Sequence, residues 1–298
     1  MTAKSDVRSA MAALAHPLDR SYRAMSYEFR VRTNVPRLGF LLDRLLRPFR
    51  ASPAEGSPTY SLIHTAGSPL PFSLYLDDER LHEVETASTM LDFVLADITV
   101  QAVERMEDHV ALHAAAAAWD RRGIIFPGPP DAGKTTLVAG LTSVGFSYLS
   151  DEAALIDPRT GVLHPFPRAL AMDGHSVDAI PGLRRKLPPD HDQYMRLRFH
   201  VAPDDLRPGA IGRPCRIKHV IAPKYEPGGG TTLEPMSRAE ALMTLAENSF
   251  NFVRFGAVAV DSLRGALEGV KCYRLRTSGL EDAIRKVLDV VGGKADSA

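Results

Sequence analysis

The first hundred residues contain short runs in which apolar and polar side chains alternate. Two examples are YSLIH at residues 60–64 and FSLYL at residues 72–76, which are separated by Gly, Ser and Pro. Alternation with a period of two puts the apolar side chains on one face of a strand, and the intervening residues favour turns. The pattern therefore predicts a small β-rich domain over residues 1–100 and a second domain over residues 101–298.

Two segments of this region have helical spacing instead. In RLGFLLDRLLRPFR, residues 37–50, four leucines fall on one helical face and arginines surround them. This helix could dock on a membrane surface or a partner, but we favour packing on its own domain. Residues 87–105 have a similar apolar period, which predicts a helix that leads into the second domain.

The second domain begins with HVALHAAAAAWDRRGIIFPG, which predicts two strands joined by a turn at residues 120–122. A helix that ends near Gly145, a strand at 146–150 and another near 153–156 should follow. Residues 160–215 have no sustained period, which indicates long functional or mobile loops. The remaining expected elements are a strand at 217–225, a turn at 228–230, and helices at 237–252 and 280–291, the first opened by a capping box of Ser237 and Glu240.

Composition narrows the classes of protein. The 298 residues are 45% hydrophobic and 24% charged, with 36 basic and 36 acidic residues. A zero net charge gives no overall attraction to nucleic acid or anionic lipid. Cys215 and Cys272 are too few for a disulfide framework and suggest buried, inert thiols in a reducing compartment. Since no segment approaches the roughly 20 apolar residues of a membrane span, we expect a cytoplasmic protein without one.

The stretch GPPDAGKTT carries the clearest chemistry. Gly128, Gly133, Lys134 and Thr135 fit the phosphate-loop pattern G-x-x-x-x-G-K-[ST], with a predicted strand before it and a helix after it. In this pattern backbone N–H groups and the lysine surround phosphates, while the hydroxyl ligates Mg²⁺. A chance Gly-rich turn is the alternative. The expected ligands are ATP and Mg²⁺, and the expected nucleotide-binding residues are Gly128, Pro129, Pro130, Asp131, Ala132, Gly133, Lys134, Thr135 and Thr136.

An acidic pair follows at once, in FSYLSDE. Asp151 lies fifteen positions beyond Thr136, which is one helix and one strand away. A carboxylate pair there would lie beside the phosphates, where one acid can hold Mg²⁺ and the other can take a proton from an acceptor hydroxyl. A solvated strand end or a helix cap is the alternative for Asp151 and Glu152. The sequence has neither an ABC-transporter signature nor a GTPase base-reading motif.

His113 is a third candidate. If the hairpin turn centres on Arg121 and Arg122, antiparallel pairing puts His113 opposite a residue near Pro130, because paired positions have a constant sum. The imidazole would then lie next to the phosphate loop. From spacing alone, a satisfied core histidine is the competing interpretation.

These pieces, in the order LHAAAAAWDRRGIIFPGPPDAGKTTLVAGLTSVGFSYLSDEAALI, resemble the HPr kinase/phosphorylase family and the wider group of HPr kinase-related proteins. The strong similarity covers residues 109–157. The later stretches HPFPRAL, LAENSFNFVRFG and CYRLRTSGLEDAI resemble the related kinases rather than the HPr-specific enzymes. The resemblance implies an α/β P-loop kinase core related to phosphoenolpyruvate carboxykinase, which moves the γ-phosphate of ATP to a serine hydroxyl.

The resemblance also implies roles for single residues. Asp151 would act as base towards the serine, Glu152 would assist with Mg²⁺, and His113 would lie in the active site. The sequence departs from the family at Pro130 and Thr135, where serine is common, and at Glu152, where the HPr enzymes carry aspartate. We find no Gly-rich C-terminal signature of the kind linked to HPr recognition and phosphorolysis, so the resemblance does not extend to HPr as the acceptor, and it leaves open whether phosphorolysis also occurs.

A cation beyond the phosphate loop should stabilise the transferring phosphoryl group. Arg168 in HPFPRAL is the first choice because two prolines restrict its backbone, and Arg254 in FNFVRFG is the second. A surface salt bridge is the alternative for each. The basic run LRRKLPPDHD, residues 183–192, is a candidate substrate-gripping loop or simply a solvated one.

The expected function is therefore an ATP-dependent kinase whose acceptor is a serine of a protein or peptide. A small-molecule kinase of the shikimate or gluconate type is the nearest alternative. A regulatory or assembly protein that binds ATP without transferring phosphate is another. No nucleic-acid partner is expected, and a homo-oligomer is compatible because the resembled enzymes form hexamers.

Overall fold

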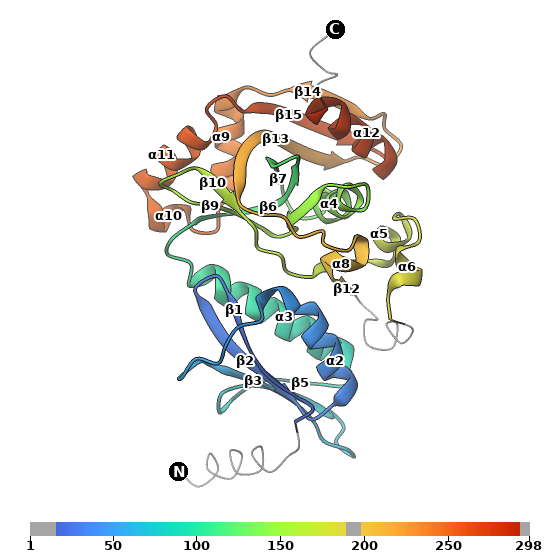
Figure 1. The fold of residues 1–298 in the computed structure, drawn as a ribbon. Coiled ribbons are helices and arrows are strands. Elements are labelled where there is room, and N and C mark those ends of the chain that lie inside the picture. The colour runs from blue at the N-terminus through green and yellow to red at the C-terminus, as the bar shows by residue number, and fades with distance from the viewer. Residues whose placement is uncertain (1–15, 189–197, 293–298) are drawn as a thin grey trace. The chain divides into compact units, whose positions relative to one another are not determined.

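The computed structural model describes residues 16–188 and 198–292 and has a mixed α/β fold (Figure 1). The chain divides into two compact units. The first runs as far as Arg105 and also holds the stretch that ends at His200, and the second comprises the rest from Met106 onward.

A five-stranded sheet with the order β1-β2-β3-β4-β5 forms the first unit. All neighbouring strands are antiparallel except β2 and β3, which are parallel. The four leucines of helix α2 are buried against β1, β2 and α3, so this helix packs on its own unit. The elements are β1 (Leu18–Ala24), β2 (Tyr27–Thr33), α2 (Pro36–Leu45), η1 (Arg47–Phe49), β3 (Thr59–His64), β4 (Phe72–Leu76), β5 (Glu79–Val84) and α3 (Ala87–Glu104).

A larger sheet with the order β10-β9-β6-β7-β13-β15-β14 forms the second unit, and β8 also pairs with β6. Strands β7, β13 and β15 are parallel, so their carboxyl ends meet at one edge. The strands are β6 (Val110–Trp119), β7 (Arg122–Pro127), β8 (Ser147–Ser150), β9 (Ala153–Ile156), β10 (Val162–His164), β13 (Cys215–Tyr225), β14 (Thr232–Pro235) and β15 (Lys271–Thr277).

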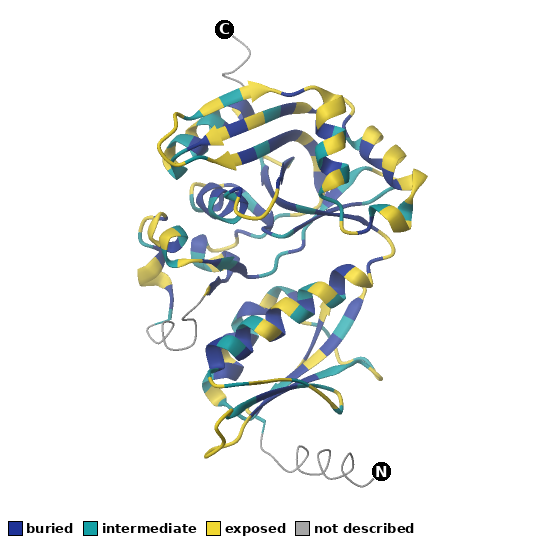
Figure 2. Cartoon of the chain, turned by 180° about the vertical axis from the view of Figure 1, so that it is seen from behind, coloured by how far each residue is buried: buried dark blue, intermediate teal, exposed yellow. Residues whose placement is uncertain are grey.

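Helices cover this sheet. The even-numbered residues of β6 join an apolar core with α9 and α11, while α4 contacts β6, β8 and α12. Burial is nearly complete along β6, where the alanines at 114–118 are at most 4% exposed (Figure 2). The helices are α4 (Lys134–Ser143), α5 (Gly174–Asp178), α6 (Leu183–Lys186), α8 (Pro203–Leu206), α9 (Arg238–Glu247), α10 (Phe252–Phe255), α11 (Ala257–Ala266) and α12 (Leu280–Val291).

Two predictions about this unit are wrong in detail. The expected helix over residues 237–252 ends at Glu247, and α10 and α11 follow it. In α11, Ala259 and Leu263 face the core at helical spacing. The supposedly aperiodic region 160–215 contains β10, α5, α6, α8 and the two-stranded sheet of β11 (Leu170–Met172) and β12 (Phe199–Val201). Elements this short leave no period in the sequence.

The predictions for the cysteines are confirmed in part. Cys215 and Cys272 are both buried and free. Burial raises the pKa of Cys215 to about 11 and also raises the pKa of Cys272. Both therefore stay protonated at neutral pH, which makes them poor nucleophiles. Within the described ranges, none of the helices combines the length and apolar character needed to cross a bilayer.

Candidate functional site

The loop between β7 and α4 is tightly curled. Strand β7 ends at Pro127 and α4 begins at Lys134, with Gly133 as its N-cap at φ 85° in the left-handed region. A Cβ on Gly128 would lie 3.2 Å from the Cβ of Ala132. Glycine suits both positions because it tolerates positive φ and close backbone approach. The loop is thus a concave stretch of backbone at the N-terminus of a ten-residue helix, where N–H groups and the helix dipole favour an anion.

Lys134 lies over this loop. Its Nζ donates to the carbonyl oxygens of Gly128 at 2.7 Å and Pro129 at 2.8 Å, and the residue is 6% exposed. Burial lowers the pKa of Lys134, while the carboxylates of Glu152 and Asp151 act in the opposite direction. The ammonium group is therefore held at the loop and within the field of the acidic pair.

The acidic pair lies on the other side of β6 from the phosphate loop. Ala114 of β6 pairs with Pro127 on one side, and its N–H donates to the carbonyl of Glu152 on the other at 3.2 Å. Strands β8 and β9 both run antiparallel to β6, so Asp151 and Glu152 interrupt what is otherwise one long strand. Adjacent strands lie about 4.8 Å apart. The interruption therefore brings the two acids within about two strand spacings of the start of the loop.

Arg168 joins the two acids. Its Nε lies 3.6 Å from Asp151 Oδ1, and its Nη1 lies 3.6 Å from Glu152 Oε2. Asp151 is 2% exposed, and the Arg168 side chain is 14% exposed. Burial raises the pKa of Asp151, and Arg168 opposes that rise. Burial works against the Arg168 cation too, yet Asp151 and then Glu152 raise its pKa overall.

Tyr148 is a member of this group that sequence reasoning missed. Its hydroxyl lies 3.0 Å from Asp151 Oδ1 and 3.0 Å from the carbonyl oxygen of Arg168, and the residue is fully buried. Its position three residues before an acid, within a short strand, is the only signal the sequence offers. A tyrosine at such a place is ordinary core composition, so nothing in the pattern singled it out.

His113 lies beside the acidic pair, but not through the pairing that the sequence suggested. The hairpin turn consists of Asp120 and Arg121, both with positive φ, which fits a two-residue type I′ turn. In each pair between β6 and β7 the two residue numbers sum to 241, so continuing this register places His113 opposite Gly128 rather than Pro130. The prediction of a residue near Pro130 is therefore wrong by two positions, because the turn lies one residue earlier.

The His113 side chain has two neighbours of different character. Its Nε2 lies 3.8 Å from Glu152 Oε1, and its ring stacks on Phe250 with centroids 5.4 Å apart. Burial and then Lys134 lower the pKa of His113, and Glu152 opposes them. At neutral pH the imidazole is therefore neutral and can donate or accept a hydrogen bond.

The remaining candidates lie at different places. Thr135 is the second residue of α4 and is half-buried, and the Thr136 hydroxyl lies 2.8 Å from the Ser176 hydroxyl of α5. Arg254 donates to the carbonyl of Met106 at 3.2 Å. Of the basic run 183–192, residues 183–186 form α6, and those from 189 onward lie outside the described residues.

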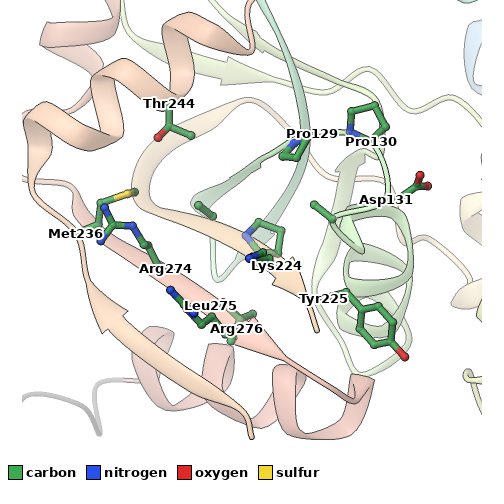
Figure 3. Close-up of a pocket in the computed structure, with 13 residues that line it drawn as sticks. Pro129, Pro130, Asp131, Lys224, Tyr225, Met236, Thr244, Arg274, Leu275 and Arg276 are labelled. Atoms are coloured by element: carbon green, nitrogen blue, oxygen red, sulfur yellow. The ribbon is translucent and has the colours of Figure 1, made fainter. Parts of the chain in front are cut away.

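A pocket of about 380 Å³ adjoins the phosphate loop at the carboxyl ends of β13 and β15 (Figure 3). The loop forms one wall, and α9 and β15 contribute others. Apolar groups and three cations share the lining. Each cation faces a carboxylate: Arg274 contacts Glu240 at 2.6 Å, Lys224 contacts Glu226 at 2.6 Å, and Arg276 contacts Glu226 at 3.8 Å. The lining residues are Pro129, Pro130, Asp131, Ala132, Ala222, Pro223, Lys224, Tyr225, Met236, Thr244, Arg274, Leu275 and Arg276.

The acidic pair is the candidate source of carboxylate ligands for a metal ion beside the loop. Among residues 16–188 and 198–292, no three His, Cys, Asp or Glu side chains are grouped so that they could enclose an ion. Mg²⁺ commonly uses one or two carboxylates together with substrate phosphates rather than a protein cage. One carboxylate and one hydroxyl beside a phosphate loop fit that mode of binding.

A scan against protein-family models finds no match to this chain, and a search of curated proteins finds no similar sequence.

Proposed function

We propose that this protein is an ATP-dependent phosphotransferase of the HPr kinase-related type, with a P-loop kinase core, which transfers the γ-phosphate to a serine hydroxyl of a protein or peptide. The observation that carries the proposal is the convergence of Lys134, Asp151, Glu152 and Arg168 around one level of β6. Phosphoryl transfer needs positioned cations and a carboxylate base more than it needs covalent chemistry. The four side chains supply those two requirements.

The phosphate loop fits a nucleoside triphosphate. Gly128 and Gly133 allow a backbone cradle that a Cβ would fill or strain, and Lys134 is held where it can bind the β- and γ-phosphates. Thr135 and Glu152 would hold Mg²⁺. When bound, Mg²⁺ neutralises charge on the phosphate oxygens and fixes their geometry.

Each remaining residue has a task in the proposed reaction. Asp151 accepts the proton of the acceptor hydroxyl, since burial already raises its affinity for a proton above that of an ordinary aspartate. Arg168 stabilises negative charge that builds on the transferring group, and between turnovers it balances the two acids. His113 is neutral and lies beside Glu152, so it can orient that carboxylate or the acceptor by hydrogen bonding.

The pocket beside the loop suits the nucleoside end of ATP. It opens at the carboxyl ends of parallel strands, which is where α/β sheets commonly bind nucleotides. Pro223, Met236 and Tyr225 provide apolar surface for a base, and Arg276 and Lys224 provide donors for sugar and phosphate oxygens.

Filling this pocket should separate binding of the nucleoside from binding of the phosphates. We expect Thr244→Trp, on the α9 wall, to weaken ATP binding about tenfold and to leave inorganic tripolyphosphate binding within twofold, as measured by calorimetry. Met243→Trp is the matched control, because that side chain belongs to the same helix and does not line the pocket. Equal weakening of both ligands by Thr244→Trp would contradict the assignment of the pocket.

The proposed function is tested by transfer of labelled γ-phosphate from Mg-ATP to polypeptides in a lysate of the source organism. We expect labelling with the intact protein and with Lys218→Ala, an exposed lysine of β13, but not with Lys134→Ala. Lys134→Ala should also weaken ATP binding at least tenfold. ATP binding without labelling would favour a small-molecule acceptor or a binder that transfers nothing, and failure to bind ATP would overturn the proposal.

A further inference from the structure

The hydroxyl of Tyr148 contacts the side chain of Asp151 and the backbone of Arg168, the two residues to which the proposed function gives the chemistry. It contacts Asp151 Oδ1 at 3.0 Å and the carbonyl oxygen of Arg168 at 3.0 Å. The arginine and aspartate also face each other at 3.6 Å. One buried phenol thus links the proposed base to the backbone that presents the proposed phosphoryl-stabilising cation.

The position of the phenol is fixed from several directions. The backbone of Tyr148 pairs with Ala117 of β6, donates to the carbonyl of Ala210 at 2.7 Å and accepts from the N–H of Gly212 at 2.8 Å. The ring is fully buried. A side chain held between two strand-like neighbours in a close-packed interior has little freedom to move. Tyr148 is therefore a rigid reference point for the two groups that it contacts.

The Tyr148 hydroxyl has one hydrogen, and both oxygens that it contacts, Asp151 Oδ1 and the Arg168 carbonyl oxygen, can accept it. Burial and the charge of Asp151 raise the pKa of Tyr148 well above its ordinary value, so the hydrogen stays on the oxygen. While Asp151 is ionised, the hydroxyl can donate to it. Once Asp151 has taken the acceptor's proton, the hydroxyl can rotate, donate to the Arg168 carbonyl and accept the new O–H of Asp151.

We propose that Tyr148 is a positioning residue of the transfer reaction, which orients Asp151 and holds it at a fixed place relative to Arg168. This inference rests on the proposed function. Asp151 also accepts a hydrogen bond from the backbone of Ala171, and the phenol adds a second hydrogen bond that fixes the orientation of the carboxyl group. An aspartate displaced by even about 1 Å from the acceptor can cost about a hundredfold in rate. Both hydrogen bonds of the Tyr148 hydroxyl go to residues outside the phosphate loop, so we expect its effect on the chemical step rather than on nucleotide binding.

The test is Tyr148→Phe, which keeps the ring and removes only the oxygen. Tyr60→Phe is the matched control, because Tyr60 is also a buried tyrosine whose hydroxyl donates to a carboxylate, that of Asp97 at 2.6 Å, and because it belongs to the first unit while the proposed site belongs to the second. The measurements are the rate of Mg-ATP turnover with water as acceptor, the dissociation constant for Mg-ATP, and the midpoint of urea unfolding.

We expect Tyr148→Phe to lower kcat about 10- to 100-fold, with the Mg-ATP dissociation constant within twofold of the unsubstituted protein. Tyr60→Phe should shift the midpoint of urea unfolding about as much as Tyr148→Phe does, but it should leave kcat within twofold of the unsubstituted protein. Equal kcat values for the two variants would overturn the positioning role and leave the proposed function intact. If the unsubstituted protein neither binds nor turns over ATP, the proposed function fails and this inference falls with it.

Discussion

Asp151→Asn is expected to reduce phosphate transfer about 10²- to 10⁴-fold, which is the usual contribution of a positioned general base. The substitution keeps the size of the side chain and an oxygen that can accept from Tyr148. It removes the group that takes the acceptor's proton. Nucleotide binding should change by less than about threefold, because Lys134 and the loop backbone carry it. The measurement is transfer of labelled phosphate alongside calorimetric binding of Mg-ATP.

Asp261→Asn is the control for this experiment. Asp261 lies on α11, is exposed and pairs with Arg264 one turn along the helix, and it has no role in the proposed reaction. It should transfer phosphate at the unsubstituted rate. A well-folded Asp151→Asn protein that keeps more than a tenth of the transfer rate would remove Asp151 from the role of base.

Arg168→Ala is expected to have the second large effect, with a loss of transfer of about 10³-fold or more. Removing this cation also leaves Asp151 buried beside Glu152 without its ion-pair partner. Breaking a buried ion pair on one side typically costs about 3–5 kcal/mol, so the unfolding midpoint in urea should fall as well. Arg168→Lys keeps a charge without the planar fork and should fold better while still transferring poorly.

The pH dependence gives a separate readout for Arg168. This cation holds the pKa of Asp151 below the value that burial alone would give, and the base must be ionised to accept a proton. In Arg168→Ala, the loss of transfer on acidification should therefore begin at a higher pH than in the unsubstituted protein. In Arg168→Lys, which keeps a positive charge, the shift should be smaller. Arg254→Ala, which removes the donor to the Met106 carbonyl, should leave the pH of this loss unchanged. If the pH of this loss shifts in Arg254→Ala and not in the Arg168 variants, Arg254 would replace Arg168 as the proposed phosphoryl-stabilising cation.

Patterns of local chemistry predicted much of the candidate site. The phosphate loop needs consecutive residues only, so Gly133, Lys134 and the helix after them could be located from the sequence. The acidic pair could also be located from the sequence, because a single helix and a single strand separate it from the loop. Arg168 was a choice among several arginines, and its contacts with both acids depend on a backbone path without any sequence period.

Features that depend on exact register or on tertiary packing could not be predicted. The turn at Asp120 and Arg121 lacks the Asn-Gly or Asp-Gly signal of such hairpins, so the level of His113 was misplaced. The expected helix over residues 237–252 was too long, because the break after Glu247 and the packing of α11 on the core depend on tertiary contacts. Tyr148 shows the same limit, because its importance comes from what its hydroxyl meets and not from its position in the chain.

The alanine-rich strand β6 has a consequence for the order of folding. Alanine has a weak preference for strands, so residues 114–118 have little tendency to become extended on their own. Their extended form depends on β7 on one side and on β8 and β9 on the other. A lone hairpin of β6 and β7 would be marginal in water. The phosphate loop and the acidic pair flank this strand, so both should acquire their final shape only when the sheet around β6 is complete, late in folding rather than at its start.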